Sequence, residues 1–222
     1  MSQIILMSDP KVAAIPVREC GACLADLRLD GRLLVDPRKQ DDSDSFFFLR
    51  EGVLERLCRA QAELPGDLRL LVVEGYRPPE LQRRYFEDYS AELRAEQPGW
   101  SEEQLRTATS RFVSPPEIAP HSAGAAVDLT LADADGNELD LGTPMNATPE
   151  ESAGACYSDA AAIDGQARGN REILGSVLRA ADFVNYPTEW WHWSFGDRYW
   201  ALVTGAAAAC YGPRGRDGQG CP

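Results

Sequence analysis

The sequence predicts an α+β fold built as a single domain. Helical and strand-like segments follow one another without the regular βαβ alternation that marks a parallel sheet. The 222 residues fit one domain, no repeat or linker divides them, and a hydrophobic share of 44% allows a sizeable core. We therefore expect one domain over residues 1–211 and a flexible tail over the Gly-rich residues 212–222.

Capping signals and the helical spacing of apolar residues predict the helices. The acidic cluster Asp41–Ser45 can accept hydrogen bonds from the unpaired N–H groups at the start of a helix. Ser101 and Gln104 form a capping box that begins a shorter helix, and a last helix is expected over Asn170–Phe183. An irregular lead-in over residues 1–15 and two further helices, over residues 46–64 and 78–97, complete this part of the prediction.

Short apolar runs between turn residues predict the strands. Leu68–Val73 and Ala125–Leu131 have the length and composition of buried strands, and the aromatic-rich Thr188–Phe195 indicates a strand or a strand end. Asp133–Glu138 resembles part of a calcium loop, but aligning its Gly with the sixth loop position leaves Leu and Gly where calcium ligands should stand. We therefore expect an Asp-Gly turn there.

The charge balance excludes several classes of partner. The chain has 22 basic and 35 acidic residues, which gives a formal net charge of −13. Nucleic acid and anionic membranes are disfavoured, because both are bound through basic patches. The N-terminus lacks the pattern of a secretory signal, and the longest apolar stretch, Trp200–Tyr211, is too short to span a bilayer. A cytoplasmic enzyme is the expected class, with no indication of its oligomeric state.

The six cysteines would be reduced thiols in that compartment. Cys20 and Cys23 form a CxxC pair, but the second pair of a zinc ribbon and the βαβ pattern around a thioredoxin-like site are both missing. We interpret the two residues as small, buried or half-buried thiols.

The two histidines of the chain stand in segments that suit metal chemistry. A catalytic zinc site needs three protein ligands and one open position, and His121, His192 and Asp128 supply two imidazoles and a carboxylate. Asp128 interrupts an apolar strand, where an unpaired carboxylate is costly to bury and a metal ion would remove the cost. Gly124 permits a turn that brings His121 back toward the same place. These residues predict one Zn²⁺ per chain.

Glu189 lies three residues before His192 in the segment Glu-Trp-Trp-His. The two side chains would share a face on a helical turn but would point oppositely on a flat strand. Because Pro187 and the aromatic run disfavour a long helix, we expect a local turn or bulge. Glu189 near the metal would act as a general base, which is typically worth roughly 10²–10⁴-fold in rate.

Three motifs together resemble the zinc D-alanyl-D-alanine dipeptidases of the VanX type. They are HxxGxAxD, which holds His121 and Asp128, the downstream EWWH, which ends at His192, and Glu74-Gly-Tyr-Arg-Pro78, which resembles the family's (D/E)GYRP segment. Their order and spacing agree over Leu68–Trp193. The resemblance implies an α+β fold of the D,D-peptidase and hedgehog-like kind, with a small antiparallel sheet flanked by helices.

The resemblance also implies roles for individual residues. It makes His121, Asp128 and His192 the zinc ligands and Glu189 the catalytic base. Arg77 would stabilise the oxyanion, a role that suits a guanidinium because it stays charged and offers several donors to one oxygen.

The residues expected to bind substrate depart from the family at two positions. Ala119 stands where the family has a Ser that helps hold the substrate carboxylate, and Asn146 stands where it has an Asp that pairs with the dipeptide ammonium. Losing that charge weakens a hydrogen bond from about 1.5–3 kcal/mol to about 1 kcal/mol. Tyr76 and Trp191 are the other two candidates, although core packing explains Trp191 and its tryptophan neighbours equally well.

Three functions follow from these residues. The first is a zinc D,D-dipeptidase that hydrolyses D-alanyl-D-alanine, a small D,D-dipeptide of peptidoglycan metabolism. The second is a D,D-carboxypeptidase or amidase that acts on N-acylated or longer peptides, because Ala119 and Asn146 alter the recognition set. The third is a non-catalytic zinc-binding module, which Arg77 and Glu189 argue against, because a structural zinc needs neither.

Overall fold

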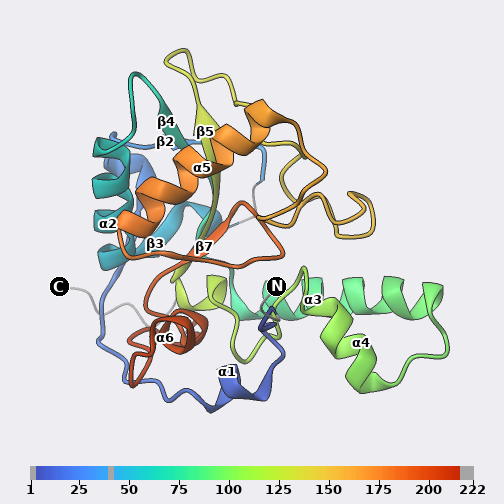
Figure 1. Cartoon of the computed structure of the whole chain (residues 1–222). Coiled ribbons are helices and arrows are strands. Elements are labelled where there is room, and N and C mark those ends of the chain that lie inside the picture. Colours follow the sequence, from blue (N-terminus) through green and yellow to red (C-terminus); the bar gives the residue numbers. More distant parts are fainter. Residues whose placement is uncertain (1–3, 40–42, 216–222) are drawn as a thin grey trace.

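Short strands and helices alternate along the chain (Figure 1). The structure is a computed structural model that describes residues 4–39 and 43–215. The strands are β1 (Leu24–Asp26), β2 (Leu34–Val35), β3 (Phe48–Arg50), β4 (Arg69–Glu74), β5 (Ala126–Ala132), β6 (Val184–Asn185) and β7 (His192–Ser194). The helices are α1 (Pro10–Ala14), α2 (Glu51–Ala62), α3 (Pro79–Glu96), α4 (Glu102–Thr109), α5 (Gly165–Ala180) and α6 (Arg198–Thr204), with 3-10 turns η1 (Leu27–Leu29), η2 (Ser45–Phe47) and η3 (His121–Ala123).

The central sheet aligns three of the residues singled out in the sequence. Its strand order is β2-β4-β5-β7-β6, while β1 and β3 form a separate two-stranded sheet. The antiparallel pairing of β5 sets Asp128 opposite His192 on β7 and opposite Glu74 on β4. The predicted α+β fold with a small antiparallel sheet is confirmed, except that β2 pairs with β4 in parallel. The connection between these two strands contains α2, and parallel neighbours need such a crossover.

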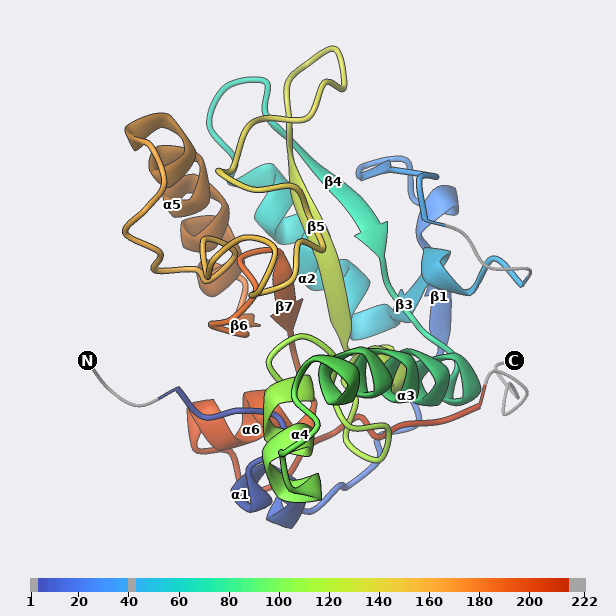
Figure 2. The same cartoon turned by 90° about the vertical axis from the view of Figure 1, so that its right-hand side faces the viewer.

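Helices α2 and α5 pack together on one face of this sheet (Figure 1). Leu57 of α2, Leu178 of α5 and Leu129 of β5 belong to one buried apolar cluster. Because successive side chains of a strand point to opposite faces, Asp128 and Thr130 point away from Leu129 and from this core. Figure 2 shows α3 and α4 beyond the end of the sheet at which β4 stops. Residues of α3 line the same cavity as Asp128 and His192.

The predicted helices are present, with ends that capping explains. The capping box of α4 is confirmed, since the side chains of Ser101 and Gln104 each bond to the other's backbone N–H. Helix α5 begins at Gly165, five residues earlier than expected, because the side chain of Asp164 accepts from a backbone N–H of its first turn.

The first predicted helix starts later than expected. Residues 48–50 pair with β1 before α2 begins at Glu51, so the sequence Phe-Phe-Phe-Leu belongs to a 3-10 turn and a strand. Of the acidic cluster expected to cap this helix, Asp41 and Asp42 lie outside the described residues. The lead-in is also more regular than expected, because it contains the short helix α1.

The first residues of the expected tail make defined contacts. The backbone N–H of Gly212 donates to the Glu19 carboxylate, and that of Arg214 donates to the Ser122 carbonyl at 2.9 Å. Residues 216–222 lie outside the described residues. The boundary of the domain at residue 211 therefore stays a prediction.

The two cysteines of the CxxC pair differ from the expectation. Cys20 is an exposed free thiol, and Cys23 is disulfide-bonded. Since Cys20 is free, the bond does not join the pair, and the local spacing gives no sign of a distant partner.

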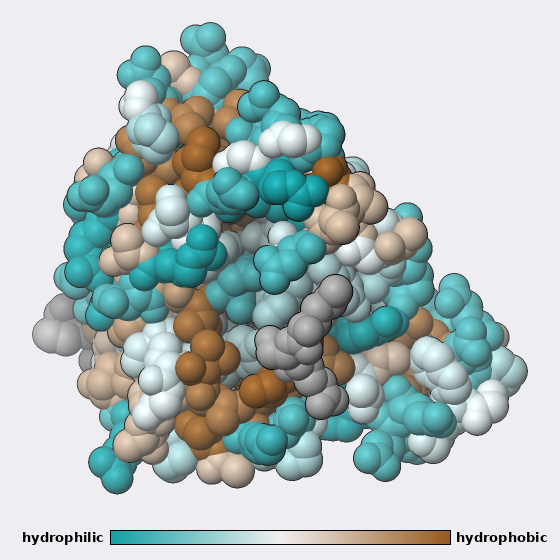
Figure 3. All heavy atoms as spheres, in the orientation of Figure 1, coloured by the Kyte–Doolittle hydropathy of each residue, from teal (hydrophilic) through white to brown (hydrophobic). Residues whose placement is uncertain are grey.

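Among the described residues, none of the helices is long and apolar enough to cross a membrane. The face in Figure 3 is largely polar, and apolar side chains gather over α6.

Candidate active site

Three buried side chains converge from one turn and two strands. His121 opens the 3-10 turn η3, which ends at Gly124 with a φ of 65°, a left-handed conformation that glycine adopts without strain. Asp128 lies within β5, and His192 begins β7 directly opposite it. The turn expected at Gly124 is therefore present, and it returns His121 to the strand that carries Asp128.

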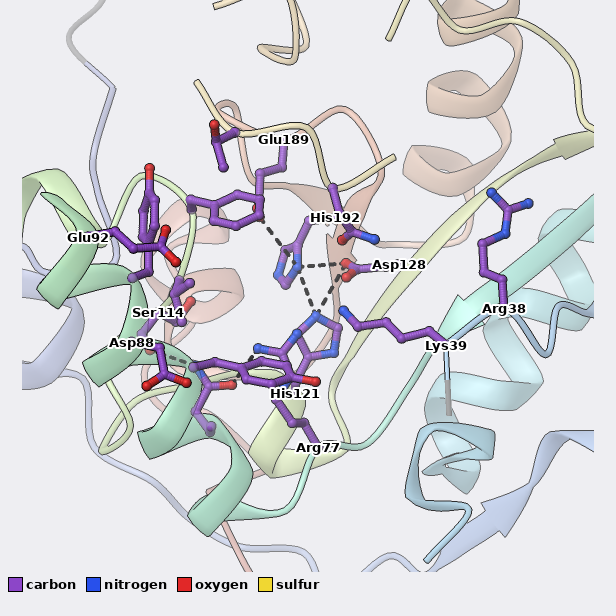
Figure 4. Close-up of a pocket in the computed structure, with 17 residues that line it drawn as sticks. Arg38, Lys39, Arg77, Asp88, Glu92, Ser114, His121, Asp128, Glu189 and His192 are labelled. Carbon is purple, nitrogen blue, oxygen red and sulfur yellow. Dashed lines mark hydrogen bonds and ion pairs between the residues drawn. The ribbon is translucent and has the colours of Figure 1, made fainter. Parts of the chain in front are cut away.

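The ligand atoms lie at spacings that suit a tetrahedral metal ion (Figure 4). Asp128 Oδ1 is 3.0 Å from His192 Nδ1 and 3.3 Å from His121 Nε2, and the two nitrogens are 3.1 Å apart. Bonds of about 2.0–2.1 Å at tetrahedral angles separate such atoms by about 3.3 Å. The three residues can therefore hold one metal ion and leave a coordination position open.

The two imidazoles are oriented in different ways. His121 Nδ1 lies 2.7 Å from the Gly75 carbonyl, so it donates a proton there and leaves Nε2 available as a ligand. His192 presents Nδ1 to the site, and its buried Nε2 has no hydrogen-bond partner among the described residues. The ring of His192 is therefore placed by its backbone and by packing against Tyr186.

Several titratable side chains of the site have pKa values shifted from their usual range. Burial alone would raise the pKa of Asp128, but His121 and His192 keep it well below its usual range. Burial lowers the pKa of His192 and so favours the neutral imidazole that binds metals. Burial raises the pKa of Glu189 well above its usual range, and the neighbouring Asp128 raises it further.

Glu189 and His192 are brought together by the expected local turn. The N–H of His192 donates to the Glu189 carbonyl at 3.3 Å, and Glu189 Oε2 lies 3.9 Å from His192 Nδ1. Glu189 is only 6% exposed. A buried carboxylate with a raised pKa beside the ligand atoms has the properties of a general base.

Arg77 belongs to the same cavity and is held by two side chains. Its Nε donates to Glu74 Oε1 at 2.5 Å and its Nη1 donates to Gln82 Oε1 at 2.8 Å. Burial alone would lower the pKa of Arg77, but Glu74 more than offsets this, so the guanidinium stays charged. It is a fixed cation at the edge of the site.

A cavity of about 540 Å³ opens in front of these groups, within the range of about 300–1,000 Å³ that is usual for ligand sites. Asn146 lines it, as expected of a substrate-binding residue. Lys39 and the α3 residues Asp88 and Glu92 also line the cavity, although they were not predicted from the sequence. Asp88 and Glu92 stand four residues apart and so share one face of a helix, and this spacing was the sign in the sequence that they could act together. Other lining residues that were not predicted are Arg38, Gln82, Tyr85, Tyr89, Phe112, Val113, Ser114 and Thr148.

The other three predicted substrate-binding residues are not among those that line the cavity. Ala119 is fully buried, and Tyr76 is also buried and donates from its hydroxyl to the Arg214 carbonyl. Trp191 packs edge-to-face against Trp190 in the apolar core. Core packing, which was the alternative for the tryptophans, therefore explains Trp191.

The fold and this constellation define a metallopeptidase: a buried His-Asp-His set, a buried glutamate and a fixed cation face one cavity. The chain belongs to the D-Ala-D-Ala dipeptidase family Peptidase_M15, whose model matches residues 41–205. This confirms the family that the three sequence motifs indicate.

Two curated relatives carry the name D-alanyl-D-alanine dipeptidase. The protein from Synechocystis sp. is 30% identical over 217 residues, which is 85% of this chain and 87% of the relative. The protein from Escherichia coli (strain K12) is 36% identical over 72 residues, which is 32% of this chain and 35% of the relative.

Solved structures are more distant. The LdcB LD-carboxypeptidase, solved in a study of peptidoglycan recognition, aligns over 86% of this chain and 76% of its own, with a TM-score of 0.47 and 15% identity. VanYB in complex with D-alanine-D-alanine aligns over 78% of this chain and 92% of its own, with a TM-score of 0.42 and 16% identity. Likenesses of this degree carry no functional argument.

Proposed function

We propose that the chain is a zinc-dependent D,D-dipeptidase that hydrolyses D-alanyl-D-alanine or a similar small D,D-dipeptide. The observation that carries the proposal is the approach of the His121, Asp128 and His192 ligand atoms to within 3.3 Å of one another, with Glu189 3.9 Å from His192. Two imidazoles and one carboxylate suit zinc and leave a position open for chemistry. The name of the Synechocystis relative supports the choice of substrate.

Each residue of the site would have its own role in the reaction. A zinc ion held by the three ligands would supply a Lewis acid for the scissile carbonyl and would lower the pKa of a water molecule to about 7. Glu189 takes the proton of the attacking water and gives it to the leaving amine, which its raised pKa allows. Arg77, fixed by Glu74, places its charge where the carbonyl oxygen becomes negative.

The test is hydrolysis of D-alanyl-D-alanine by the zinc-loaded protein, with zinc measured on the same preparation. Glu189→Ala should lower kcat by at least about 10²-fold while the zinc content stays at one per chain. Near-normal activity of zinc-bound Glu189→Ala would show that Glu189 is not the base.

A second candidate keeps the chemistry and changes the substrate. Asn146 lines the cavity with a neutral amide, so a D,D-carboxypeptidase or amidase acting on N-acylated or longer peptides is the alternative. The ratio of kcat/KM for D-alanyl-D-alanine to that for its N-acetylated form separates the two. A strong preference for the free amine excludes the alternative. Nothing in the site favours a non-catalytic module, and the family is one of peptidases.

The compartment remains an expectation of the sequence. A cytoplasmic enzyme is the class that the sequence predicts, whereas the disulfide bond of Cys23 favours an oxidising compartment, because the cytosol keeps thiols reduced. Cell fractionation combined with thiol labelling of Cys23 would decide between them.

A further inference from the structure

Lys39 is the one lysine of the catalytic cavity, and the proposed mechanism gives it no task. The chain has only two lysines, Lys11 and Lys39, among 22 basic residues. The Lys39 side chain is 23% exposed and forms an ion pair with Glu74 Oε2. Figure 4 shows it extending from the wall of the cavity toward His121 and Asp128.

The ion pair between Lys39 and Glu74 leaves an excess of positive charge at the wall of the cavity that carries Lys39. Glu74 is fully buried and its single carboxylate faces two cations, Arg77 Nε and Lys39 Nζ. Two positive charges against one negative charge leave a net positive charge beside the ligand set. Two donor atoms of Arg77, Nε and Nη1, already donate to Glu74 and Gln82. Lys39 has three N–H donors on a rotatable ammonium, and an anion in the cavity can accept from them.

Aromatic rings hold the ammonium of Lys39 in place. Its Nζ lies 5.7 Å from the ring centroid of Phe46 and 5.7 Å from that of Tyr85, within the distance at which a ring face attracts a cation. The nearby Arg38 differs, because two carboxylates, those of Asp36 and Glu138, neutralise it. Lys39 is therefore the cation whose charge is directed to the cavity.

The opposite wall of the cavity has the opposite charge. Asp88 and Glu92 of α3 are exposed, line the cavity and form no ion pair with any described residue. In Figure 4 they lie across the metal ligands from Lys39. A negative group of the substrate is repelled from the α3 wall and attracted to Lys39.

We propose that Lys39 binds the C-terminal carboxylate of the substrate and restricts the enzyme to the last peptide bond of D,D-peptides. This inference rests on the proposed D,D-peptidase function and deepens it. Both a dipeptidase and a carboxypeptidase release a residue with a free carboxylate, so a carboxylate bound by Lys39 excludes an amidase. Whether the substrate needs a free amine depends on Asn146 and not on Lys39.

The kinetic test compares D-alanyl-D-alanine with its C-terminal carboxamide in the zinc-loaded wild type, Lys39→Met and Lys39→Arg. Losing a hydrogen bond to a charged group costs about 10–100-fold. Lys39→Met should lower kcat/KM for the acid by that factor, chiefly through KM, and should leave the carboxamide unchanged. Lys39→Arg should keep most of the preference for the acid. Lys11→Met, which removes the other lysine, exposed on α1 and absent from the cavity lining, should stay within about threefold of the wild type.

A binding measurement separates the two proposals. Calorimetric titration of the acid and the carboxamide into zinc-loaded Glu189→Gln, with and without Lys39→Met, reports recognition without turnover. Binding of the acid that depends on Lys39 supports the inference even if the wild type fails to hydrolyse the dipeptide, in which case the proposed function alone is wrong. An equal loss for acid and carboxamide, or no binding of the acid to the parent, overturns the assignment of Lys39. Thermal unfolding of each variant shows that it is folded.

Discussion

Two turns carry residues of the candidate metal site, and these turns are stabilised in different ways. The first turn, residues 120–125, carries His121, and the second turn, residues 185–192, carries Glu189 and His192. Bonds from distant parts of the chain hold the first turn: Arg50 Nε donates to the Ala123 carbonyl at 2.8 Å, and the N–H of Arg214 donates to Ser122.

The second turn has side-chain bonds from within, in addition to distant bonds such as that from the Trp190 N–H to the Cys156 carbonyl and that from the Ser158 N–H to the Pro187 carbonyl. The Asn185 side-chain amide donates to the Glu189 carbonyl at 2.9 Å and to the His192 carbonyl at 3.0 Å, and the N–H of Glu189 donates to the Tyr186 carbonyl. The two turns therefore differ in their side-chain support, which comes from the distant Arg50 in the first turn and from Asn185, a residue of the turn itself, in the second. Variants that remove one bond at a time can test this difference.

The largest effect is expected at Arg50, which is fully buried. Its guanidinium donates to the carbonyls of Ala123 and Ala22 and pairs with Glu19. Arg50→Met should destabilise the protein by about 3–5 kcal/mol, because it leaves buried acceptors without donors. It should also weaken zinc binding, because the turn that carries His121 loses its support.

The measurement is chemical denaturation together with zinc affinity by competition with a chelator. Arg59→Met is the matched control, since Arg59 lies on α2 with 59% of its side chain exposed. If Arg50→Met loses stability but keeps full zinc affinity, Arg50 does not support the first turn.

The second prediction concerns Glu74, whose neighbour Gly75 orients His121. Burial alone would raise the pKa of Glu74, but Arg77 and Lys39 lower it to about 2. Because the pKa of Glu74 is lower in the folded protein than in the unfolded chain, where it is about 4.3, the ionised carboxylate stabilises the folded protein at pH values above about 4.3. This stabilisation is on the order of 3 kcal/mol and is lost as the pH falls toward 2.

Denaturation curves at pH 7, 5, 4 and 3 would measure this contribution. Glu74→Gln should be less stable than the wild type at pH 7, and the two should converge as the pH approaches 2. The same change at the exposed Glu63 should leave the curve unaltered. A constant difference between Glu74→Gln and wild type at every pH would contradict the prediction.

The third prediction concerns Asn185 in the second turn. Asn185→Ala removes the two bonds that the side-chain amide donates within the turn, worth about 2 kcal/mol, and also the Oδ1 that accepts from Ser158 Oγ. Hydrogen exchange should quicken at the N–H groups of Glu189 and His192, while that of Ala123 stays protected, because the first turn does not depend on Asn185. Asn185→Asp, which keeps the acceptor of Ser158 but loses the donor, should quicken exchange at the same two N–H groups. Faster exchange in both turns would show that they are coupled.

The sequence predicted the part of the site that follows local rules. Asp128 stood out because a carboxylate in an apolar strand needs a partner, Gly124 indicated the turn, and the motifs named His121, His192, Glu189 and Arg77. The cavity wall was not predictable, because Lys39 and the α3 acids reach the site only through the packing of distant segments. For the same reason Tyr76 and Trp191, close to site residues in sequence, turned out to point into the core.

The smallest effect is expected at Arg214, in the segment expected to be a flexible tail. Its N–H donates to Ser122 at 2.9 Å, and its carbonyl accepts from the Tyr76 hydroxyl at 2.8 Å. Arg214→Pro removes the donor and should cost about 1 kcal/mol, or about fivefold in zinc affinity if the bond steadies His121. Arg214→Ala keeps the backbone donor and should bind zinc like the wild type. If proline and alanine variants bind zinc equally well, the C-terminal segment only covers the first turn, and its distant support comes from Arg50 and from the Arg77 N–H that donates to the His121 carbonyl.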